Sequence, residues 1–106
     1  MKLSILDQSP IIKGHSPNTA ITETVNLAKI ADELGFYRYW LAEHHNMRGL
    51  ASSCPEILLT AIGQQTKRIR IGTGAVLLPY YSAAKIAEMF RMQEALCPGR
   101  LDLGIG

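Results

Sequence analysis

Short apolar segments alternate with longer amphipathic segments along the whole chain, and this alternation restricts the fold more than any other feature. Four segments have the length and the β-branched or aromatic content of strands, namely 2–6, 37–43, 68–78 and 100–105. Three segments between them carry apolar residues at helical spacing, namely about 18–34, 57–65 and 83–96. Strands separated by helices predict parallel pairing through right-handed crossovers.

The order β-α-β-α-β-α-β fits two α/β architectures. One is a small open doubly wound sheet, and the other is part of a TIM-type (β/α) barrel. A barrel of eight such units takes about 250 residues, whereas this chain has 106. The alternation by itself leaves both architectures open.

Helix boundaries are predicted from capping residues. Asn18 or Thr19 is expected to cap the first helix, and Gly35 to end it. The stretch Ser53-Cys54-Pro55-Glu56 has the spacing of a capping box, which predicts the start of the second helix. Ser82 is expected to cap the third helix.

Composition and charge exclude several classes of protein. Hydrophobic residues make up 47% of the chain, which is enough for a packed core, and the net charge of +2 is spread along it. We therefore expect no nucleic-acid partner, which would require a basic stripe. No apolar run approaches the ~20 residues of a membrane span. Asp7 comes too early for a signal peptide, and Cys54 and Cys97 make no disulfide framework, so a cytoplasmic location is expected.

The sequence Glu43-His44-His45 stands at the carboxyl end of the second predicted strand. Ligand sites of parallel α/β folds lie at the carboxyl ends of the strands, and histidine exchanges protons near neutral pH. The two histidines are therefore candidate acid/base residues, although a polar loop contacting backbone carbonyls would have the same sequence. A metal site that adds Cys54 is disfavoured, because adjacent histidines diverge on extended backbone and no second pair is present.

Glycine-containing strand ends are a second candidate feature. Gly72-Thr73-Gly74-Ala75-Val76 lies in the third predicted strand, where two glycines indicate a bulge, close helix packing, or close approach of a flat ligand. Leu103-Gly104-Ile105-Gly106 ends the fourth strand in a similar way. Asp7-Gln8-Ser9 ends the first strand, where it predicts either a pocket wall or a turn that caps its own backbone.

Taken together, five stretches resemble the bacterial-luciferase-like flavin monooxygenases in order and spacing. They are Leu6-Asp7-Gln8-Ser9-Pro10, Arg38-Tyr39-Trp40-Leu41-Ala42-Glu43-His44-His45, Ala51-Ser52-Ser53-Cys54-Pro55-Glu56, Ile69-Arg70-Ile71-Gly72-Thr73-Gly74-Ala75-Val76-Leu77-Leu78 and Pro98-Gly99-Arg100-Leu101-Asp102-Leu103-Gly104-Ile105-Gly106. The resemblance implies a partial (β/α) barrel. Residues 1–106 would be its N-terminal portion, roughly the first half, incomplete at the C-terminus.

The resemblance also implies an activity. The family fold binds reduced FMN supplied by a separate reductase, or in some relatives a deazaflavin coenzyme, and uses molecular oxygen to oxidise a small organic substrate. His44 would be the acid/base residue, His45 would lie beside it, and Glu43 would orient the pair.

The cofactor would lie against Thr73, Gly74 and Ala75 in the third strand and against Gly104 and Gly106 at the end of the fourth. Gly74-Ala75 would correspond to the family's non-proline cis peptide. Gly106 stands where some light-emitting subunits have a reactive cysteine, so no thiol role is expected there.

The family holds the flavin phosphate mainly through the second half of the barrel, so the isolated chain is expected to be inactive. Strands with open edges predict a homo-oligomer. One alternative is a non-catalytic truncated remnant that folds by self-association. Another is a small open α/β binding module unrelated to flavin.

Overall fold

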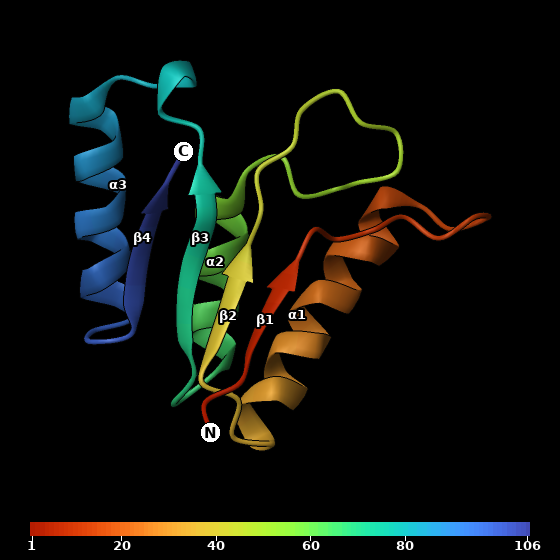
Figure 1. The fold of residues 1–106 in the computed structure, drawn as a ribbon, viewed down its shortest axis with the longest axis horizontal. Coiled ribbons are helices and arrows are strands. Elements are labelled where there is room, and N and C mark those ends of the chain that lie inside the picture. Colours follow the sequence, from red (N-terminus) through yellow and green to blue (C-terminus); the bar gives the residue numbers. More distant parts are fainter.

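The computed structural model describes all 106 residues and contains one four-stranded parallel sheet in the order β1-β2-β3-β4 (Figure 1). The strands are β1 (Ser4–Asp7), β2 (Arg38–Leu41), β3 (Arg70–Val76) and β4 (Leu101–Ile105). The helices are α1 (Pro17–Glu33), α2 (Pro55–Gln65) and α3 (Ala83–Leu96), with a 3₁₀ turn at Leu78–Tyr80. The predicted order of strands and helices is confirmed.

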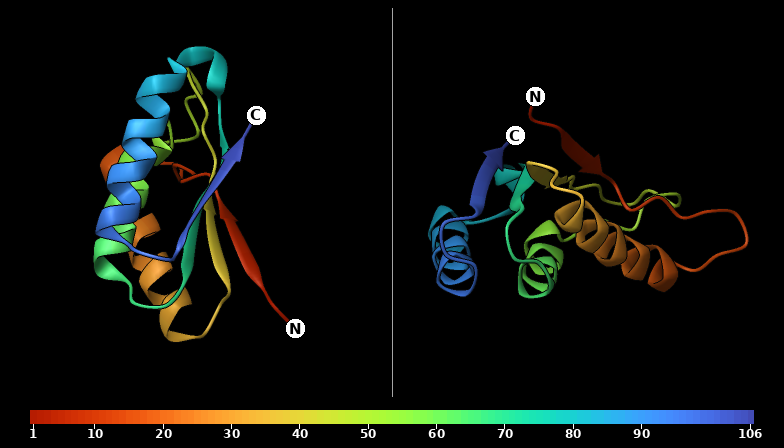
Figure 2. Two further views of the ribbon diagram at one scale, coloured as in Figure 1. Left: turned by 90° about the vertical axis from the view of Figure 1, so that its left-hand side faces the viewer. Right: turned by 90° about the horizontal axis from the view of Figure 1, so that it is seen from below.

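The three helices lie on one face of the sheet, and the opposite face is uncovered (Figure 2). Each strand pairs with the next one in the chain. A doubly wound sheet reverses its strand order and carries helices on both faces, whereas a (β/α) barrel winds in one direction with its helices outside. The structure therefore corresponds to part of a barrel.

The main core fills the space between the sheet and helices α1 and α2. Alternate strand residues point to this side, and small residues of α1 allow the helix to approach closely. Burying each larger apolar side chain contributes about 1.5–3 kcal/mol. The buried cluster consists of Ala28, Ala31, Tyr39, Leu41, Leu58, Leu59, Ile62, Ile69, Ile71 and Cys97. A smaller cluster of Val76, Ile86 and Phe90 joins β3 to α3.

The uncovered face of the sheet is organised around Trp40. A Cβ atom at Gly72 would lie 2.6 Å from the Trp40 ring, and one at Gly74 would lie 3.3 Å from the Trp40 side chain. Leu6 borders the same space, 3.5 Å from a Cβ placed on Gly74. The glycines of β3 therefore make room for an aromatic side chain of the neighbouring strand.

An ion-pair cluster ties the amino-terminal halves of three strands together. Asp102 on β4 accepts from Arg70 on β3 at 2.8 and 2.9 Å, and from Arg38 on β2 at 2.6 Å. The hydrogen bond from Arg70 is the largest cause that lowers the pKa of Asp102, and Arg38 acts in the same direction. This cluster fixes the lateral order of the strands.

Two predicted helix starts are wrong. Ser16, not Asn18 or Thr19, caps α1, because Ser16 Oγ accepts the Thr19 backbone N–H at 3.2 Å. Cys54 is the cap residue of α2 and makes no capping hydrogen bond with its side chain, so the capping box at Ser53 does not form. Both helices begin with proline, whose fixed φ suits the first helical position. The Ser82 cap of α3 is confirmed.

The Asp-Gln-Ser segment after β1 forms a turn that satisfies its own backbone. Asp7 Oδ1 accepts the Ser9 backbone N–H at 2.7 Å, and Asp7 Oδ2 accepts the Tyr39 hydroxyl. Ser9 Oγ lies 2.7 Å from Thr24 Oγ1 of α1. The predicted self-capping turn is confirmed, and Asp7 and Gln8 also line a surface pocket together with Leu6, Pro10 and Leu50.

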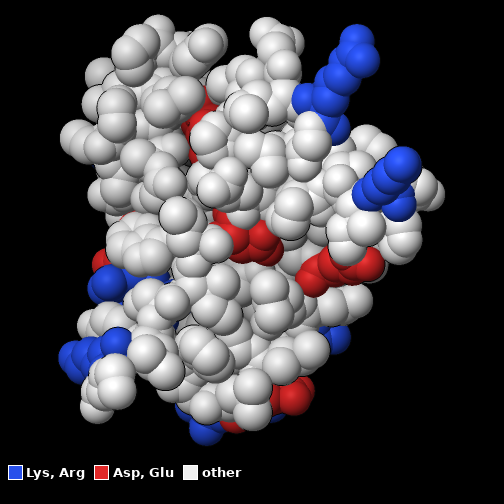
Figure 3. Space-filling view, turned by 45° about the vertical axis from the view of Figure 1, so that its right-hand side comes forward, with Lys and Arg blue, Asp and Glu red and all other residues white.

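Charged residues are scattered over the surface shown in Figure 3, where Lys and Arg form no continuous stripe. No helix of the structure has both the length and the apolar composition that crossing a membrane requires.

Candidate active site

The loop after β2 presents Glu43, His44 and His45 at the carboxyl end of the sheet. Its base is closed by Ser52, whose Oγ donates to the Ala42 carbonyl at 2.6 Å and whose carbonyl accepts the His44 N–H at 2.9 Å. The predicted acid/base segment is therefore held at both ends.

Glu43 and His45 form the closest polar pair of this loop. Glu43 Oε2 lies 2.7 Å from His45 Nε2. The Glu43 side chain is fully buried, while that of His45 is 29% exposed. The ring of Tyr80 packs against the His45 ring with a centroid separation of 4.7 Å and an interplanar angle of 38°. The His45 ring is therefore held by a hydrogen bond at Nε2 and by packing of Tyr80 on one of its faces.

The Glu43 carboxylate also contacts the loop between β3 and α3. Its Oε1 accepts the Leu77 backbone N–H at 3.3 Å. Burial, and then hydrogen bonding to Glu43, raise the pKa of Tyr81, so its hydroxyl stays a proton donor beside the carboxylate. One buried carboxylate therefore joins the ends of β2 and β3.

His44 differs from its neighbour. Its backbone is fixed by Ser52, but its half-buried ring makes no side-chain hydrogen bond within the chain. The resemblance implied that Glu43 holds both histidines, whereas of the two only His45 has a side-chain hydrogen bond to the carboxylate in the structure.

The ends of β3 and β4 lie side by side, and they bring together the residues predicted to contact a cofactor. Thr73 Oγ1 donates to the Gly104 carbonyl at 2.8 Å and accepts the Gly104 N–H at 3.1 Å. Gly106 N–H donates to the Val76 carbonyl at 2.9 Å. A Cβ on Gly106 would lie 3.3 Å from that of Ala75.

Thr73 is fully buried, and both polar functions of its hydroxyl are used by Gly104. A Cβ on Gly104 would overlap the Thr73 carbonyl. These two residues therefore shape the strand pair, and the backbone of Gly74 and Ala75 remains as the surface that a ligand could approach. The Gly74–Ala75 peptide bond is cis, as the resemblance implied.

Sequence reasoning missed the aromatic residues Tyr80 and Tyr81, which reach the site from the loop after β3. Their signal was an aromatic pair after Pro79, in the short connection between the third predicted strand and the third predicted helix. It also missed Asn46, which adopts a left-handed φ of 57° directly after His45, a conformation that asparagine tolerates better than most residues.

No three His, Cys, Asp or Glu side chains of the structure come together as ligands of a single metal ion. His45 Nε2 is bonded to Glu43, and Cys54 lies at the start of α2, where its Sγ is 3.8 Å from Ser53 Oγ.

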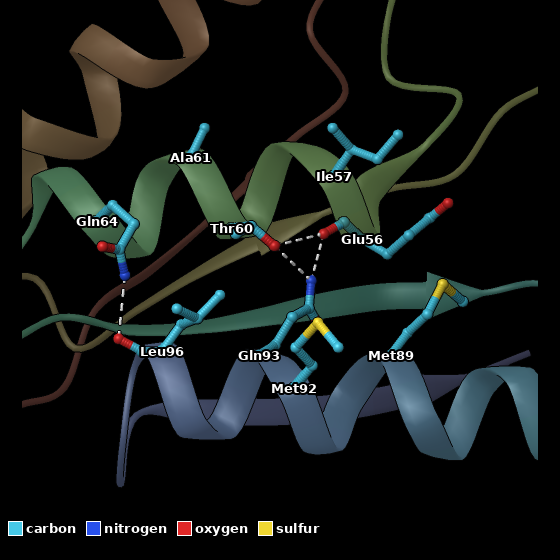
Figure 4. A pocket seen from close by; sticks show the side chains of 9 residues that line it. All are labelled: Glu56, Ile57, Thr60, Ala61, Gln64, Met89, Met92, Gln93 and Leu96. Carbon is cyan, nitrogen blue, oxygen red and sulfur yellow. Dashed lines mark hydrogen bonds between the residues drawn. The ribbon is translucent and has the colours of Figure 1, made fainter.

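An apolar groove lies elsewhere on the surface, between α2 and α3 (Figure 4), with a volume of about 530 Å³. Gln93 crosses its floor, donating to Thr60 Oγ1 at 3.0 Å and to the Glu56 carbonyl. Gln93 Oε1 and Glu56 Oε2 are buried without a partner. None of the residues lining this groove belongs to the predicted site.

A singly wound parallel α/β sheet with polar and glycine-rich residues at its carboxyl edge defines the class of (β/α)-barrel proteins with a strand-end site. The sequence profile of the luciferase-like monooxygenases matches residues 1–106. The chain therefore belongs to the luciferase-like monooxygenase family.

Curated relatives agree with this assignment. An uncharacterised protein, YwcH, from Bacillus subtilis is 54% identical over 106 residues, which are all of this chain and 32% of the relative. The N-acetyl-S-alkylcysteine monooxygenase of the same organism is 47% identical over 106 residues, with the same coverage of 100% and 32%. The chain thus spans about a third of the length of these relatives.

Solved structures share the fold. Apo-MsnO8 has a TM-score of 0.97 at 47% identity, over 99% of this chain and 32% of that one. A second structure is the oxygenating constituent of 3,6-diketocamphane monooxygenase from Pseudomonas putida, a type II Baeyer-Villiger monooxygenase in complex with FMN. It has a TM-score of 0.94 at 29% identity, and the match covers 100% of this chain and 29% of that one. A coenzyme F420-dependent tetrahydromethanopterin reductase from Methanopyrus kandleri has a TM-score of 0.68 at 23% identity, and the match covers 100% of this chain and 26% of that one. At this identity the likeness shows the fold alone.

Proposed function

We propose that the chain carries the acid/base segment and part of the flavin-binding surface of an FMN-dependent monooxygenase that oxidises a small organic substrate with molecular oxygen. Residues 1–106 would form the N-terminal portion of the barrel domain. One observation carries the proposal: Glu43 links the His45 ring to the backbone after β3, so the acid/base segment and the proposed flavin surface meet at one edge of the sheet.

The residues present fit a flat cofactor. The Gly74–Ala75 backbone lies next to the end of β4 and is partly exposed, with the Trp40 and Leu6 side chains bordering it on the Gly74 side. The FMN complex of the structural relative supports FMN, and the deazaflavin coenzyme that the resemblance also implied is the less favoured candidate. When bound in reduced form, supplied by a separate reductase, the flavin provides the electrons for oxygen chemistry.

The chain's own residues would bind and move protons. His44, whose ring is free of internal hydrogen bonds, would act as the acid/base residue, with His45 beside it and Glu43 holding His45. Gly74 and Ala75 would offer the flat surface, Gly106 would extend it, and Thr73 and Gly104 would keep the two strands in register.

We also propose that the chain associates with itself along its open sheet edges. β1 and β4 each lack a partner on one side, and Leu6, Leu103 and Ile105 on these strands are about half exposed. Exposed apolar edge strands favour pairing between copies.

A cytoplasmic location is proposed as well, since both cysteines are free thiols, the state that a reducing compartment maintains.

Gel filtration of the chain with FMN, followed at protein and flavin wavelengths, tests the proposed cofactor surface. We expect flavin to co-elute with an oligomer. Ala75→Leu should reduce the bound flavin, because a larger side chain would cover the backbone surface. Ala95→Leu, the same change at an exposed position late in α3, should leave flavin binding unchanged.

If flavin binds and the assembled chain oxidises a substrate, loss of that activity in His44→Ala supports the acid/base role. A folded oligomer that never retains flavin would instead favour the other candidate, a non-catalytic chain that folds by association. The exposed apolar side chains of the edge strands are the observation that supports this second candidate.

A further inference from the structure

Of the two adjacent histidines, only His45 has a fixed ring. Glu43 Oε2 holds its Nε2 at 2.7 Å, and Tyr80 covers one face of the ring. Tyr80 itself is 66% exposed, so the core does not require its ring at that position. The remaining ring nitrogen of His45, Nδ1, has no hydrogen bond within the chain.

The identity of the protonated nitrogen follows from the acceptor. An ionised carboxylate can only accept hydrogen bonds, so the ring nitrogen that faces it must carry a proton. The Glu43 carboxylate is held from a second side, because its other oxygen accepts the Leu77 N–H at 3.3 Å. The neutral His45 ring then has a lone pair on Nδ1 only.

We propose that Glu43 and Tyr80 are positioning residues that hold His45 with the proton on Nε2, so that Nδ1 is the nitrogen offered to substrate or cofactor. The use of Nδ1 in the reaction rests on the proposed monooxygenase function, but the protonation pattern does not. When Nδ1 takes a proton, the ring keeps its bond to the carboxylate, and the new charge lies beside that group.

Long-range ¹H–¹⁵N NMR of the histidine rings in the full chain tests the proposal. We expect a hydrogen-bonded, slowly exchanging proton on Nε2 of His45 and no proton on Nδ1 at a pH where the ring is neutral. His15→Ala and His44→Ala together assign the signals of the three histidines, and both should leave the His45 signals unchanged. A proton found on Nδ1 of neutral His45 would overturn the proposal.

Single substitutions distinguish the contribution of Glu43 to the protected Nε2 proton from that of Tyr80. Glu43→Leu removes the acceptor at similar volume and should abolish the protected Nε2 proton. If this variant does not fold, Glu43→Gln serves instead: its single carbonyl oxygen cannot serve both His45 and Leu77, so the Nε2 proton should exchange faster. A protected proton that persists unchanged in the folded Glu43 variant contradicts the role of Glu43.

Tyr80→Phe keeps the ring and should preserve the protection, whereas Tyr80→Ser should speed exchange. Equal exchange in these two variants would remove Tyr80 from the proposal. Added FMN should shift the Nδ1 resonance while Nε2 stays protonated. If the Nε2 proton depends on Glu43 but FMN changes no His45 resonance, the ring geometry stands and the contact of Nδ1 with the cofactor fails. Gel filtration with FMN then decides the proposed flavin function separately.

Discussion

At the scale of single residues, Asp32 connects the end of α1 to the beginning of β3. Its carboxylate accepts three consecutive backbone N–H groups, from Lys67 at 2.8 Å, Arg68 at 2.9 Å and Ile69 at 2.8 Å. Burial raises its pKa, but the three hydrogen bonds and the charge of Arg68 outweigh burial, and the net pKa is lowered. The start of β3 therefore depends on an ionised carboxylate.

Asp32→Asn should lower the free energy of unfolding at pH 7 by about 1–3 kcal/mol, because an amide oxygen cannot replace both carboxylate oxygens as acceptors. Since the folded pKa is below the unfolded one, the ionised form stabilises the fold above about pH 4, and this contribution is lost as pH falls through the folded pKa. Urea unfolding at pH 7 and pH 3 measures both effects. A variant with the same acid dependence as the wild type would contradict this account.

Gly63 is a residue whose lack of a side chain is required by packing. A Cβ atom there would overlap Cys97 Sγ and lie 3.1 Å from Ile71. In Gly63→Ala, overpacking should cost about 1–3 kcal/mol. This exceeds the roughly 0.5–1 kcal/mol that alanine gains over glycine in a helix. Thermal unfolding should show a lower midpoint, and adding Cys97→Ala should restore part of the loss. Gly49→Ala, with no atom within 4 Å of the new Cβ, is the matched control.

At the scale of secondary-structure elements, the helix starts show how capping depends on backbone geometry. Ser82 has an extended backbone at the start of α3, and its Oγ accepts the Lys85 N–H at 3.0 Å. Ser53 has an equally suitable sequence context, but α2 starts one residue later, after Cys54. The proline at position 55 fixes the first helical residue and displaces the cap from serine to cysteine.

We therefore expect Ser82→Ala to cost about 1 kcal/mol of stability, a usual value for loss of a capping hydroxyl. Ser53→Ala should stay within roughly 0.5 kcal/mol of the wild type, as for surface positions without such a contact. Chemical denaturation of both variants under one condition checks the comparison. Equal losses would mean that Ser53 contributes to α2 in a way that its contacts do not show.

At the scale of the whole molecule, the sheet has one bare face and two open edges (Figures 1 and 2). Leu103 on β4 is 47% exposed and Ile105 is 59% exposed. Self-association through this edge should weaken when a charge is placed there, because lysine on an edge strand opposes pairing. Leu103→Lys is expected to shift the sedimentation profile toward the monomer.

The groove between α2 and α3 provides the matched control for this experiment. Ile57→Lys places the same charge at an exposed apolar position, 69% exposed, beside that groove. It should leave the oligomer intact if the strand edge is the contact. Dissociation by Ile57→Lys with an unchanged Leu103→Lys variant would assign the contact to the helices instead.

The sequence by itself determined the order of strands and helices, because burial periodicity is a local property of the chain. It also indicated the family, since five segments from Leu6 to Gly106 kept their order and spacing. The Ser82 cap was predictable for the same reason, as the capping serine and the amide it accepts are three residues apart.

Only the tertiary structure decided between an open sheet and part of a barrel, because the face on which a helix packs depends on contacts between distant segments. It also decided that Glu43 holds His45 and not His44, and that Tyr80 and Leu77 reach this pair from the loop after β3. The contacts made by Tyr80 and Leu77 join residues more than 30 positions apart, and no local pattern of side chains specifies such a distance. The physical reason is that side-chain partners are set by how the strands pair, and strand pairing is a property of the folded chain.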